Sequence, residues 1–247
     1  MASRIALSLL FLVVAVAGNY EHKQVKLNLG TIVDSFLWQD FLKKFKDERT
    51  AEKEVRRYVK SLVKMVNGFA KKMVPRVVFE LVDVIIWKKQ RNVYRAAKKG
   101  QLQMVLKKLW AAVLMETRDR GKYHVRHALT SHLVYPRLGG RAYKERACTD
   151  WAVSCGFATV KGVEVRGQRI RNADTMAHEL GHLIGIDHKS EGKSCYYPQN
   201  GDWAKPACGR AFQRFLDSDW GSRCPAPEDI ANKTSNWSRP ALVYVNN

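Results

Sequence analysis

The sequence predicts an α/β domain in which helices pack on a mixed or parallel β-sheet. Segments with the two-residue period of a strand alternate with segments of helical period as far as Tyr143, and this alternation is typical of such a fold. From Lys189 onward Gly, Pro, Cys and Trp become frequent, which indicates a loop-rich C-terminal subdomain. With 247 residues and no repeat or linker, we expect a single domain over 19–225.

The N-terminal residues 1–18 have the pattern of a secretory signal peptide. Arg4 precedes an apolar run over 5–17, and the small residues at 15–18 suit a cleavage site. An uncleaved membrane anchor is the alternative, but the run is shorter than the roughly 20 residues that a spanning helix needs. We therefore expect a secreted protein with no transmembrane segment and a polar tail over 226–247.

A strand and a helix are predicted next. Residues 25–34 alternate between apolar and polar side chains, which predicts a strand. Across 51–73, apolar residues such as Val55, Val59 and Leu62 recur at three- and four-residue steps, with lysines and arginines between them. That spacing predicts an amphipathic helix with a basic outer face.

The remaining elements of the sheet follow Pro75, which ends this helix. Residues 77–87 are rich in β-branched side chains and are predicted as a central, largely buried strand. An apolar stripe predicts a second helix over 101–115, and strands are predicted at 123–129 and at 140–143 after a glycine turn. In the C-terminal subdomain, a short helical pattern at 211–216 is the one regular element expected.

Three histidines and a glutamate are grouped in residues 178–188, His-Glu-Leu-Gly-His-Leu-Ile-Gly-Ile-Asp-His. His178 and His182 are four residues apart, so they share one face of a helix and both rings can reach one ion. Gly185 can end that helix with a positive φ and turn the chain so that His188 reaches the same ion. Three neutral histidines leave one coordination position open, which is typical of catalytic zinc.

Glu179 follows the first of these histidines and is the natural general base for a water molecule at the open position. We expect the helix to be capped by Asn172 or Asp174. If the histidines were instead ordinary core residues, Gly185 and His188 would have no role. The other histidines lack metal-binding spacing, and we interpret them as structural or surface groups: His22, His124, His127 and His132.

The second half of the chain contains all five cysteines: Cys148, Cys155, Cys195, Cys208 and Cys224. In an exported protein they favour disulfides with one cysteine left over, but the spacing alone does not determine the pairs. Asn232 and Asn236 each begin an Asn-x-Ser/Thr tripeptide and are predicted glycosylation sites in the polar tail.

The chain has a formal net charge of +20 and a pI of about 9.9. This charge favours anionic partners such as heparin-like glycans, acidic proteins or charged membrane surfaces, whereas nucleic acid is disfavoured as the partner of an exported protein. The alternative is a solvated basic surface that only keeps the protein soluble. Charge alone therefore assigns no function.

The motif at 178–188 resembles the signature of the metzincin zinc endopeptidases, His-Glu-x-x-His-x-x-Gly-x-x-His, in full. Within that superfamily the chain is most similar to the catalytic domain of the reprolysins, which include the snake-venom and ADAM-type proteases. The likeness extends over about 25–225. It is carried by three stretches besides the motif: 140–143 leading to Cys148, then 175–177, then Cys208 with 215–216 and 224–225.

The resemblance implies a five-stranded mixed sheet with helices, a small irregular C-terminal subdomain, and one zinc ion in the cleft between. It implies disulfides Cys148–Cys224 and Cys195–Cys208, which would leave Cys155 free. The implied activity is that of a secreted zinc-dependent endopeptidase that acts on protein substrates. Because the strand pattern begins soon after the signal segment, we expect no long inhibitory propeptide.

Two positions depart from the reprolysin pattern. Lys189 stands where the family usually has an aspartate that locks the lower subdomain, and Tyr197 stands where the family has a methionine beneath the zinc ligands. These departures favour an alternative function, a catalytically weak or inactive metalloproteinase-fold protein that docks to anionic glycans or acidic proteins. A matrixin- or astacin-like protease is a third interpretation, which differs in subfamily but not in reaction.

Overall fold

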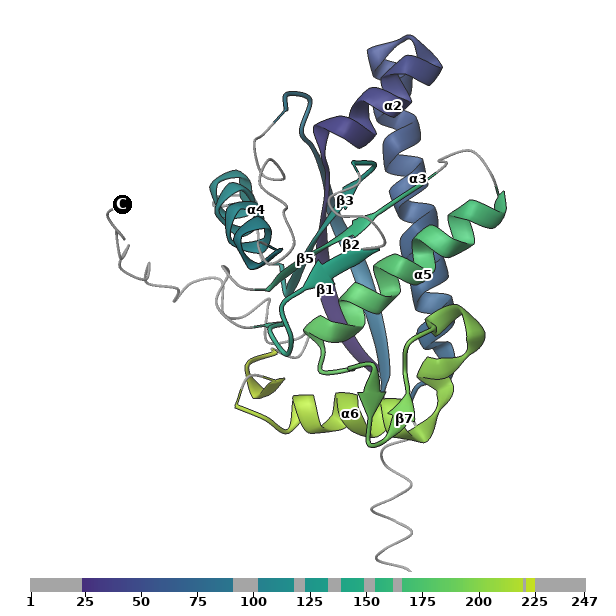
Figure 1. Ribbon diagram of the computed structural model, residues 1–247, viewed down its shortest axis with the longest axis vertical. Coiled ribbons are helices and arrows are strands. Elements are labelled where there is room, and N and C mark those ends of the chain that lie inside the picture. Colours follow the sequence, from purple (N-terminus) through teal and green to yellow (C-terminus); the bar gives the residue numbers. More distant parts are fainter. Residues whose placement is uncertain are drawn as a thin grey trace, which may run out of the picture.

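The computed structural model describes residues 24–90, 102–117, 123–132, 139–148, 154–161, 166–219 and 221–224 (Figure 1). The predicted signal peptide and the polar tail with Asn232 and Asn236 lie outside these residues. Among the described residues, no helix is both long and apolar enough to span a bilayer.

A five-stranded sheet with the strand order β2-β1-β3-β5-β4 forms the centre of the molecule. Four strands are parallel, and they are β1 (Gln24–Val33), β2 (Arg76–Ile86), β3 (Val125–Thr130) and β5 (Cys155–Thr159). At one edge, β4 (Gly140–Ala142) runs antiparallel to β5. The expected α/β fold with a mixed five-stranded sheet is therefore confirmed.

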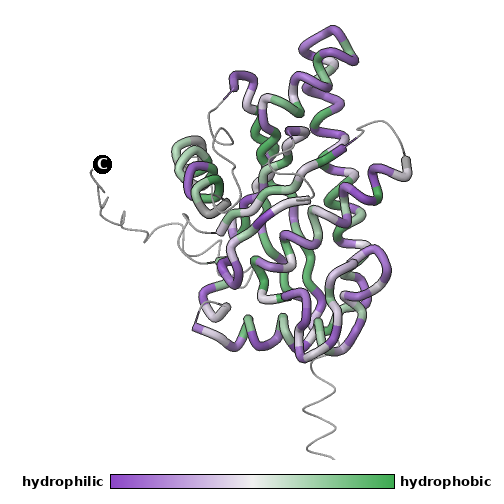
Figure 2. The backbone as a smooth tube through the Cα atoms, in the orientation of Figure 1, coloured by the Kyte–Doolittle hydropathy of each residue, from purple (hydrophilic) through white to green (hydrophobic). Residues whose placement is uncertain are grey.

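Helices cover both faces of the sheet (Figure 1). One face carries α2 (Ser35–Phe45), α3 (Glu48–Phe69) and α5 (Arg166–Leu183), and the other carries α4 (Leu102–Thr117). The larger core, with residues such as Val59 and Met176, lies beneath α3 and α5, and a smaller core with Leu109 lies beneath α4. Figure 2 shows hydrophobic residues concentrated in the strands and hydrophilic ones along the outer helix surfaces.

Aspartates fix where the first two helices begin. The side chain of Asp34 accepts a hydrogen bond from the Leu37 amide (2.9 Å), and that of Asp47 accepts one from the Thr50 amide (2.7 Å). Each bond satisfies one of the unpaired amides at a helix N-terminus. The Asp47 cap explains why α3 begins three residues before the predicted start at position 51.

The prediction that 77–87 forms a central, largely buried strand is wrong. β2 lies at the edge of the sheet, where it pairs with β1 alone among the described strands. Val82 is half exposed, and the exposed Glu80 forms an ion pair with Lys26. β-branched side chains suit an edge strand as well as a central one, so composition alone does not separate the two.

The expected caps of the motif helix are also wrong, because α5 begins at Arg166. Asn172 lies inside the helix and is buried, with its amide nitrogen 2.9 Å from both the Tyr58 hydroxyl and the Lys161 carbonyl. The carboxylate of Asp174 accepts a hydrogen bond from the Gln199 amide (2.8 Å). Both side chains therefore join α5 to neighbouring segments.

The C-terminal subdomain is small and irregular, as expected. It contains a two-stranded hairpin of β6 (Lys189–Ser190) and β7 (Lys193–Ser194), the helix α6 (Pro206–Leu216), and three short 3₁₀ helices (Pro198–Asn200, Asp202–Ala204 and Gly221–Arg223). Disulfides Cys148–Cys224 and Cys195–Cys208 are both present, and Cys155 is free and buried. The first disulfide joins the segment after β4 to the end of this subdomain.

Candidate metal centre

The last two turns of α5 place two of the three histidines of the motif. His178 and His182 lie one helical turn apart, with ring centroids separated by 4.7 Å. The helix ends in a Schellman motif, in which the Ile186 amide donates to the Gly181 carbonyl (2.8 Å) and the Gly185 amide donates to the His182 carbonyl (3.2 Å).

Gly185 is required at this helix end for two reasons. Its φ of 82° is unfavourable for residues with a side chain, and an added Cβ would lie only 2.8 Å from the Cβ of Phe215 in α6. The turn that it makes returns His188 to α5, as the sequence predicts. The Nε2 atoms of His178 and His188 are 3.0 Å apart, and ligand atoms of all three histidines lie within 4.8 Å of one another.

Hydrogen bonds at the far side of two imidazoles orient them for a metal. The Nδ1 of His178 is 2.9 Å from the Tyr196 carbonyl oxygen, and the Nδ1 of His182 is 3.1 Å from the Ile186 carbonyl oxygen. Since a carbonyl can only accept, each Nδ1 must carry the hydrogen, which leaves the Nε2 lone pair free. This is the usual outer-shell arrangement of metal-binding histidines.

The protonation state of these histidines also fits a cation. Burial lowers the pKa of His178, and burial together with the two neighbouring histidines lowers the pKa of His182 to about 4. Both rings are therefore neutral at physiological pH, as a metal ligand must be. The three histidines fit a divalent metal such as zinc, which three imidazoles typically hold with one position open.

Glu179 is 5% exposed, and its Oε2 has no hydrogen-bond partner among the described residues. Burial raises its pKa to about 8, against the opposing charge of Arg141. Gly140 lies directly against it, because a Cβ at Gly140 would be 2.9 Å from the Glu179 Oε1. From the sequence, Gly140 is predicted only to follow a turn and to begin a strand. Its packing against Glu179 is not apparent from the sequence.

Two charged residues link the edge strand to the loop that carries His188. Lys144, two residues after β4, donates a hydrogen bond to Asp187 Oδ2 (2.5 Å), and the other carboxylate oxygen accepts from the His188 amide (2.7 Å). The same segment continues along the end of α5, where the Glu145 amide donates to the His182 carbonyl (2.9 Å). Neither Lys144 nor Asp187 carries a signal in the sequence that points to this contact.

Tyr196, and not Tyr197, packs against the histidines. The ring centroid of Tyr196 is 4.7 Å from that of His178 and 4.9 Å from that of His188. The Tyr197 ring is half exposed and contacts the Tyr196 ring edge-on, so the expectation that position 197 lies beneath the ligands is wrong. The Tyr197 amide donates to Asp202 (2.7 Å), and this bond fixes the backbone there.

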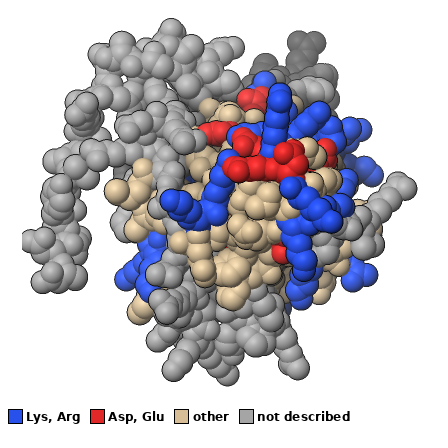
Figure 3. Space-filling model, turned by 90° about the horizontal axis from the view of Figure 1, so that it is seen from above, with Lys and Arg blue, Asp and Glu red and all other residues tan. Residues whose placement is uncertain are grey.

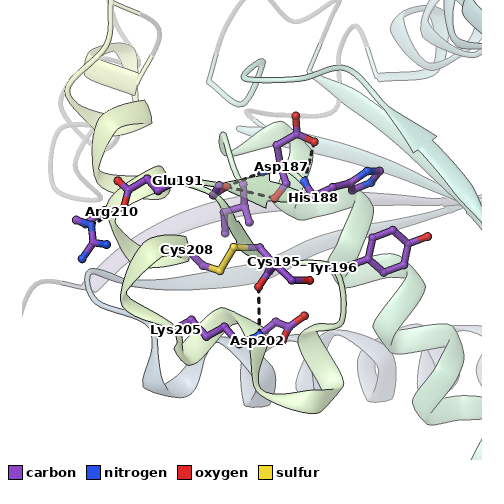
Figure 4. Close-up of a disulfide and its surroundings, with 12 residues drawn as sticks. Asp187, His188, Glu191, Cys195, Tyr196, Asp202, Lys205, Cys208 and Arg210 are labelled. Atoms are coloured by element: carbon purple, nitrogen blue, oxygen red, sulfur yellow. Dashed lines mark hydrogen bonds and ion pairs between the residues drawn. A yellow bond between two sulfur atoms is a disulfide. The ribbon is translucent and has the colours of Figure 1, made fainter.

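Asp202 supplies a buried carboxylate in the lower subdomain, where Lys189 cannot. Lys189 is exposed in β6, whereas Asp202 is 6% exposed and also accepts a hydrogen bond from Lys205 (2.5 Å). In Figure 4 the Cys195–Cys208 disulfide lies between His188 and Tyr196 on one side and Glu191 and Arg210 on the other. The lower subdomain is therefore held together by the carboxylate of Asp202, not by one at position 189, and by this disulfide.

Three other histidines of the described residues are not part of the metal-binding group. His124 and His127 are buried in and beside β3, and His132 stacks on Phe36 with ring centroids 4.5 Å apart, so these histidines are structural. His22, Asn232 and Asn236 lie outside the described residues.

This fold, with three converging histidines on a helix and its following turn, defines a metallopeptidase of the metzincin type. The chain belongs to the reprolysin-like metallopeptidases, because residues 56–189, just over half of it, match the family described as "Metallo-peptidase family M12B Reprolysin-like". A solved structure entitled "Structure of a chaperone-substrate complex" is similar at 14% identity and a TM-score of 0.47. That match covers 66% of this chain and 24% of the other, and it says nothing about function.

Proposed function

We propose that the protein is a secreted zinc-dependent endopeptidase that hydrolyses peptide bonds in proteins. Membership of a metallopeptidase family supports the class of reaction. The observation that carries the proposal is the pair of Nδ1 hydrogen bonds to the Tyr196 and Ile186 carbonyls, which direct two Nε2 atoms to the same point as His188. Three imidazoles with an open fourth position favour zinc and a catalytic role.

Glu179 is the proposed general base and acid. When bound by the three histidines, zinc would supply the Lewis acidity that polarises a water molecule and the scissile carbonyl. Glu179 would accept the proton of the attacking water and then donate it to the leaving amine. Its position supports this role, because the carboxyl is buried and its Oε2 has no hydrogen-bond partner among the described residues, so it is available to exchange a proton with a bound water.

The edge strand is the proposed site for the substrate backbone. β4 pairs with β5 along one side, and its other side is the end of the described sheet. An extended peptide could add there as a further strand, because main-chain hydrogen bonds bind peptides of many sequences. Gly140 begins this strand and touches Glu179, so the scissile bond would lie beside the general base.

Secretion is part of the proposal and is supported by two features. The N-terminal residues 1–18 have a signal-peptide pattern. Two disulfides tie the C-terminal subdomain together, and disulfides persist in oxidising compartments outside the cytosol.

Replacement of the general base tests the function. Glu179→Gln should retain zinc, measured by atomic absorption, and should lose casein cleavage, because an amide cannot accept the proton from water. Glu80→Gln makes the same chemical change on the exposed edge of β2 and should cleave like wild type. Cleavage by wild type should stop with a chelator and return with zinc. Wild type that holds zinc without any cleavage would favour the non-enzymatic docking protein instead.

A further inference from the structure

The solvent-facing side of α3 carries a continuous line of basic residues, here named the α3 ridge. Successive members are three, four or seven positions apart, so they follow one side of the helix. The last member lies in the 3₁₀ turn Ala70–Lys72 that directly continues α3, and the ridge is about 33 Å long at 1.5 Å per residue. All of its members are exposed: Arg49, Lys53, Arg57, Lys60, Lys64 and Lys71.

Beyond Glu54, α3 and the turn that follows it carry no carboxylate that could neutralise the ridge. Residues 55–79 contain seven basic residues and no acidic one. The three glutamates of α3 lie at its N-terminal end, where Glu48 pairs with Lys88, Glu52 with Arg56, and Glu54 with Arg57. Within the described part of the chain, Arg57 is therefore the ridge residue with a carboxylate partner. A helix whose charges serve only solubility usually mixes both signs along one face.

The ridge is also held rigidly. The opposite side of α3 is fully buried against the sheet through residues such as Val55, Val59 and Leu62. Ridge residues four positions apart are therefore fixed about 6 Å apart along a straight axis. Figure 3, which views the molecule from above Figure 1, shows Lys and Arg side chains on both sides of a smaller group of Asp and Glu side chains.

The ridge and the metal centre lie on different parts of the sheet. α3 packs over β2 and α5, whereas the motif helix α5 packs over β5 and β4 at the other edge (Figure 1). An occupant of the ridge would leave the edge strand β4 and the three histidines accessible. Binding at the ridge is therefore independent of the proposed peptidase activity.

From these observations we propose that the α3 ridge binds a linear sulfated glycan of the heparin type. A row of cations along one side of a helix complements a linear chain of sulfates, and four of the six ridge residues are lysines, which bind such groups as point charges. Nucleic acid fits less well, because the aromatic residues of α3 are buried or partly buried and offer no stacking surface: Tyr58 and Phe69.

Two matched double variants test the proposal with a fluorescent heparin oligosaccharide as the probe. Lys60→Gln/Lys64→Gln removes two charges from the centre of the ridge, and Lys107→Gln/Lys108→Gln removes two exposed lysines from α4 on the other sheet face. The ridge variant should bind at least tenfold more weakly at physiological salt, and its affinity should depend less steeply on salt. The α4 variant should change affinity less than twofold.

Other results of the same titration would overturn the proposal. An equal loss of affinity in both variants would indicate net charge and not the ridge. Heparin that binds equally well after chemical desulfation would exclude recognition of sulfates. A DNA duplex that competes as strongly as heparin, and that also loses affinity in the ridge variant, would identify the surface as a nucleic-acid site.

Discussion

Gly140 and Glu179 are in direct contact, and the contact leaves no room for a side chain at position 140. A Cβ there would lie 2.7 Å from the Cγ of Glu179 and 2.4 Å from the Phe157 carbonyl oxygen. The strand that we propose to bind substrate and the residue that we propose as general base are thus fitted to each other. A change in either one alters the position of the other.

Gly140→Ala should therefore reduce peptidase activity and leave the metal in place. The added methyl group must displace Glu179 or β4, and a misplacement of about 1 Å can cost about 100-fold in rate. The kcat for casein and the zinc content measure the two effects separately. Gly139→Ala is the matched control and should keep nearly full activity. Its Cβ would lie 3.2 Å from Thr175 Cγ2, a side-chain atom, and not against Glu179. Full activity of Gly140→Ala would refute the packing argument.

Gly185→Ala should destabilise the protein more than Gly201→Ala. Both glycines have a φ of 82°, so each substitution costs about 1–2 kcal/mol of backbone strain. A Cβ at Gly201 meets no atom within 4 Å, whereas one at Gly185 lies 2.8 Å from the Phe215 Cβ. Urea unfolding measures the loss in free energy of unfolding for each variant. Equal losses would mean that α6 moves aside for the added methyl group without cost. Only Gly185→Ala should also weaken zinc binding, because it displaces His188.

Lys144→Met should weaken zinc binding by up to about tenfold, because outer-shell partners of a ligand loop typically change metal affinity by such factors. Lys144 is exposed and Asp187 is about half exposed, so the loss of zinc affinity should be at the low end of the range seen for such partners. Competition with a chromogenic chelator measures the zinc affinity. Lys161→Met removes another exposed lysine away from the loop and should bind zinc like wild type. The same affinity in both variants would show that the Lys144 contact does not orient the loop.

His127 should make the metal-free protein less stable in acid. It is fully buried, and burial lowers its pKa to about 3, whereas an unfolded histidine has a pKa near 6.5. Below pH 6.5 the unfolded chain binds a proton that the folded chain does not, so the free energy of unfolding falls by up to about 1.4 kcal/mol per pH unit as the pH falls toward 3. His127→Leu should remove this contribution, and urea unfolding between pH 7 and 4 should give a shallower slope. An unchanged slope would assign the acid sensitivity to other groups.

The metal centre was predictable from sequence because its geometry is local. His178 and His182 are positioned by one helix and His188 by one glycine turn, so spacing alone specifies them. Three strongly periodic segments, now α3, α4 and β1, were predictable for the same reason. Asn172 and Asp174 misled the prediction of the helix start, because polar residues that suit a cap also suit contacts with Tyr58 and Gln199.

Features that depend on distant contacts were not predictable. α2 and β5 were not predicted, and both are stabilised by the core around them, in which Leu37 and Phe157 are fully buried. Which tyrosine lies against the histidines is decided by Asp202, which holds the Tyr197 backbone from five residues away. The same carboxylate is buried in the lower subdomain, whereas Lys189 is exposed, and a pattern read position by position does not reveal which residue supplies such a group.

The disulfide between Cys148 and Cys224 spans 76 residues, and this loop contains His178, His182 and His188. A single cut within the loop, by another protease or by a second copy of this one, would leave two fragments that stay covalently joined. In such a nicked chain the disulfide would keep both fragments, and with them the three histidines, in one covalently linked molecule. On electrophoresis it would migrate as a single band without reductant and as two bands with it.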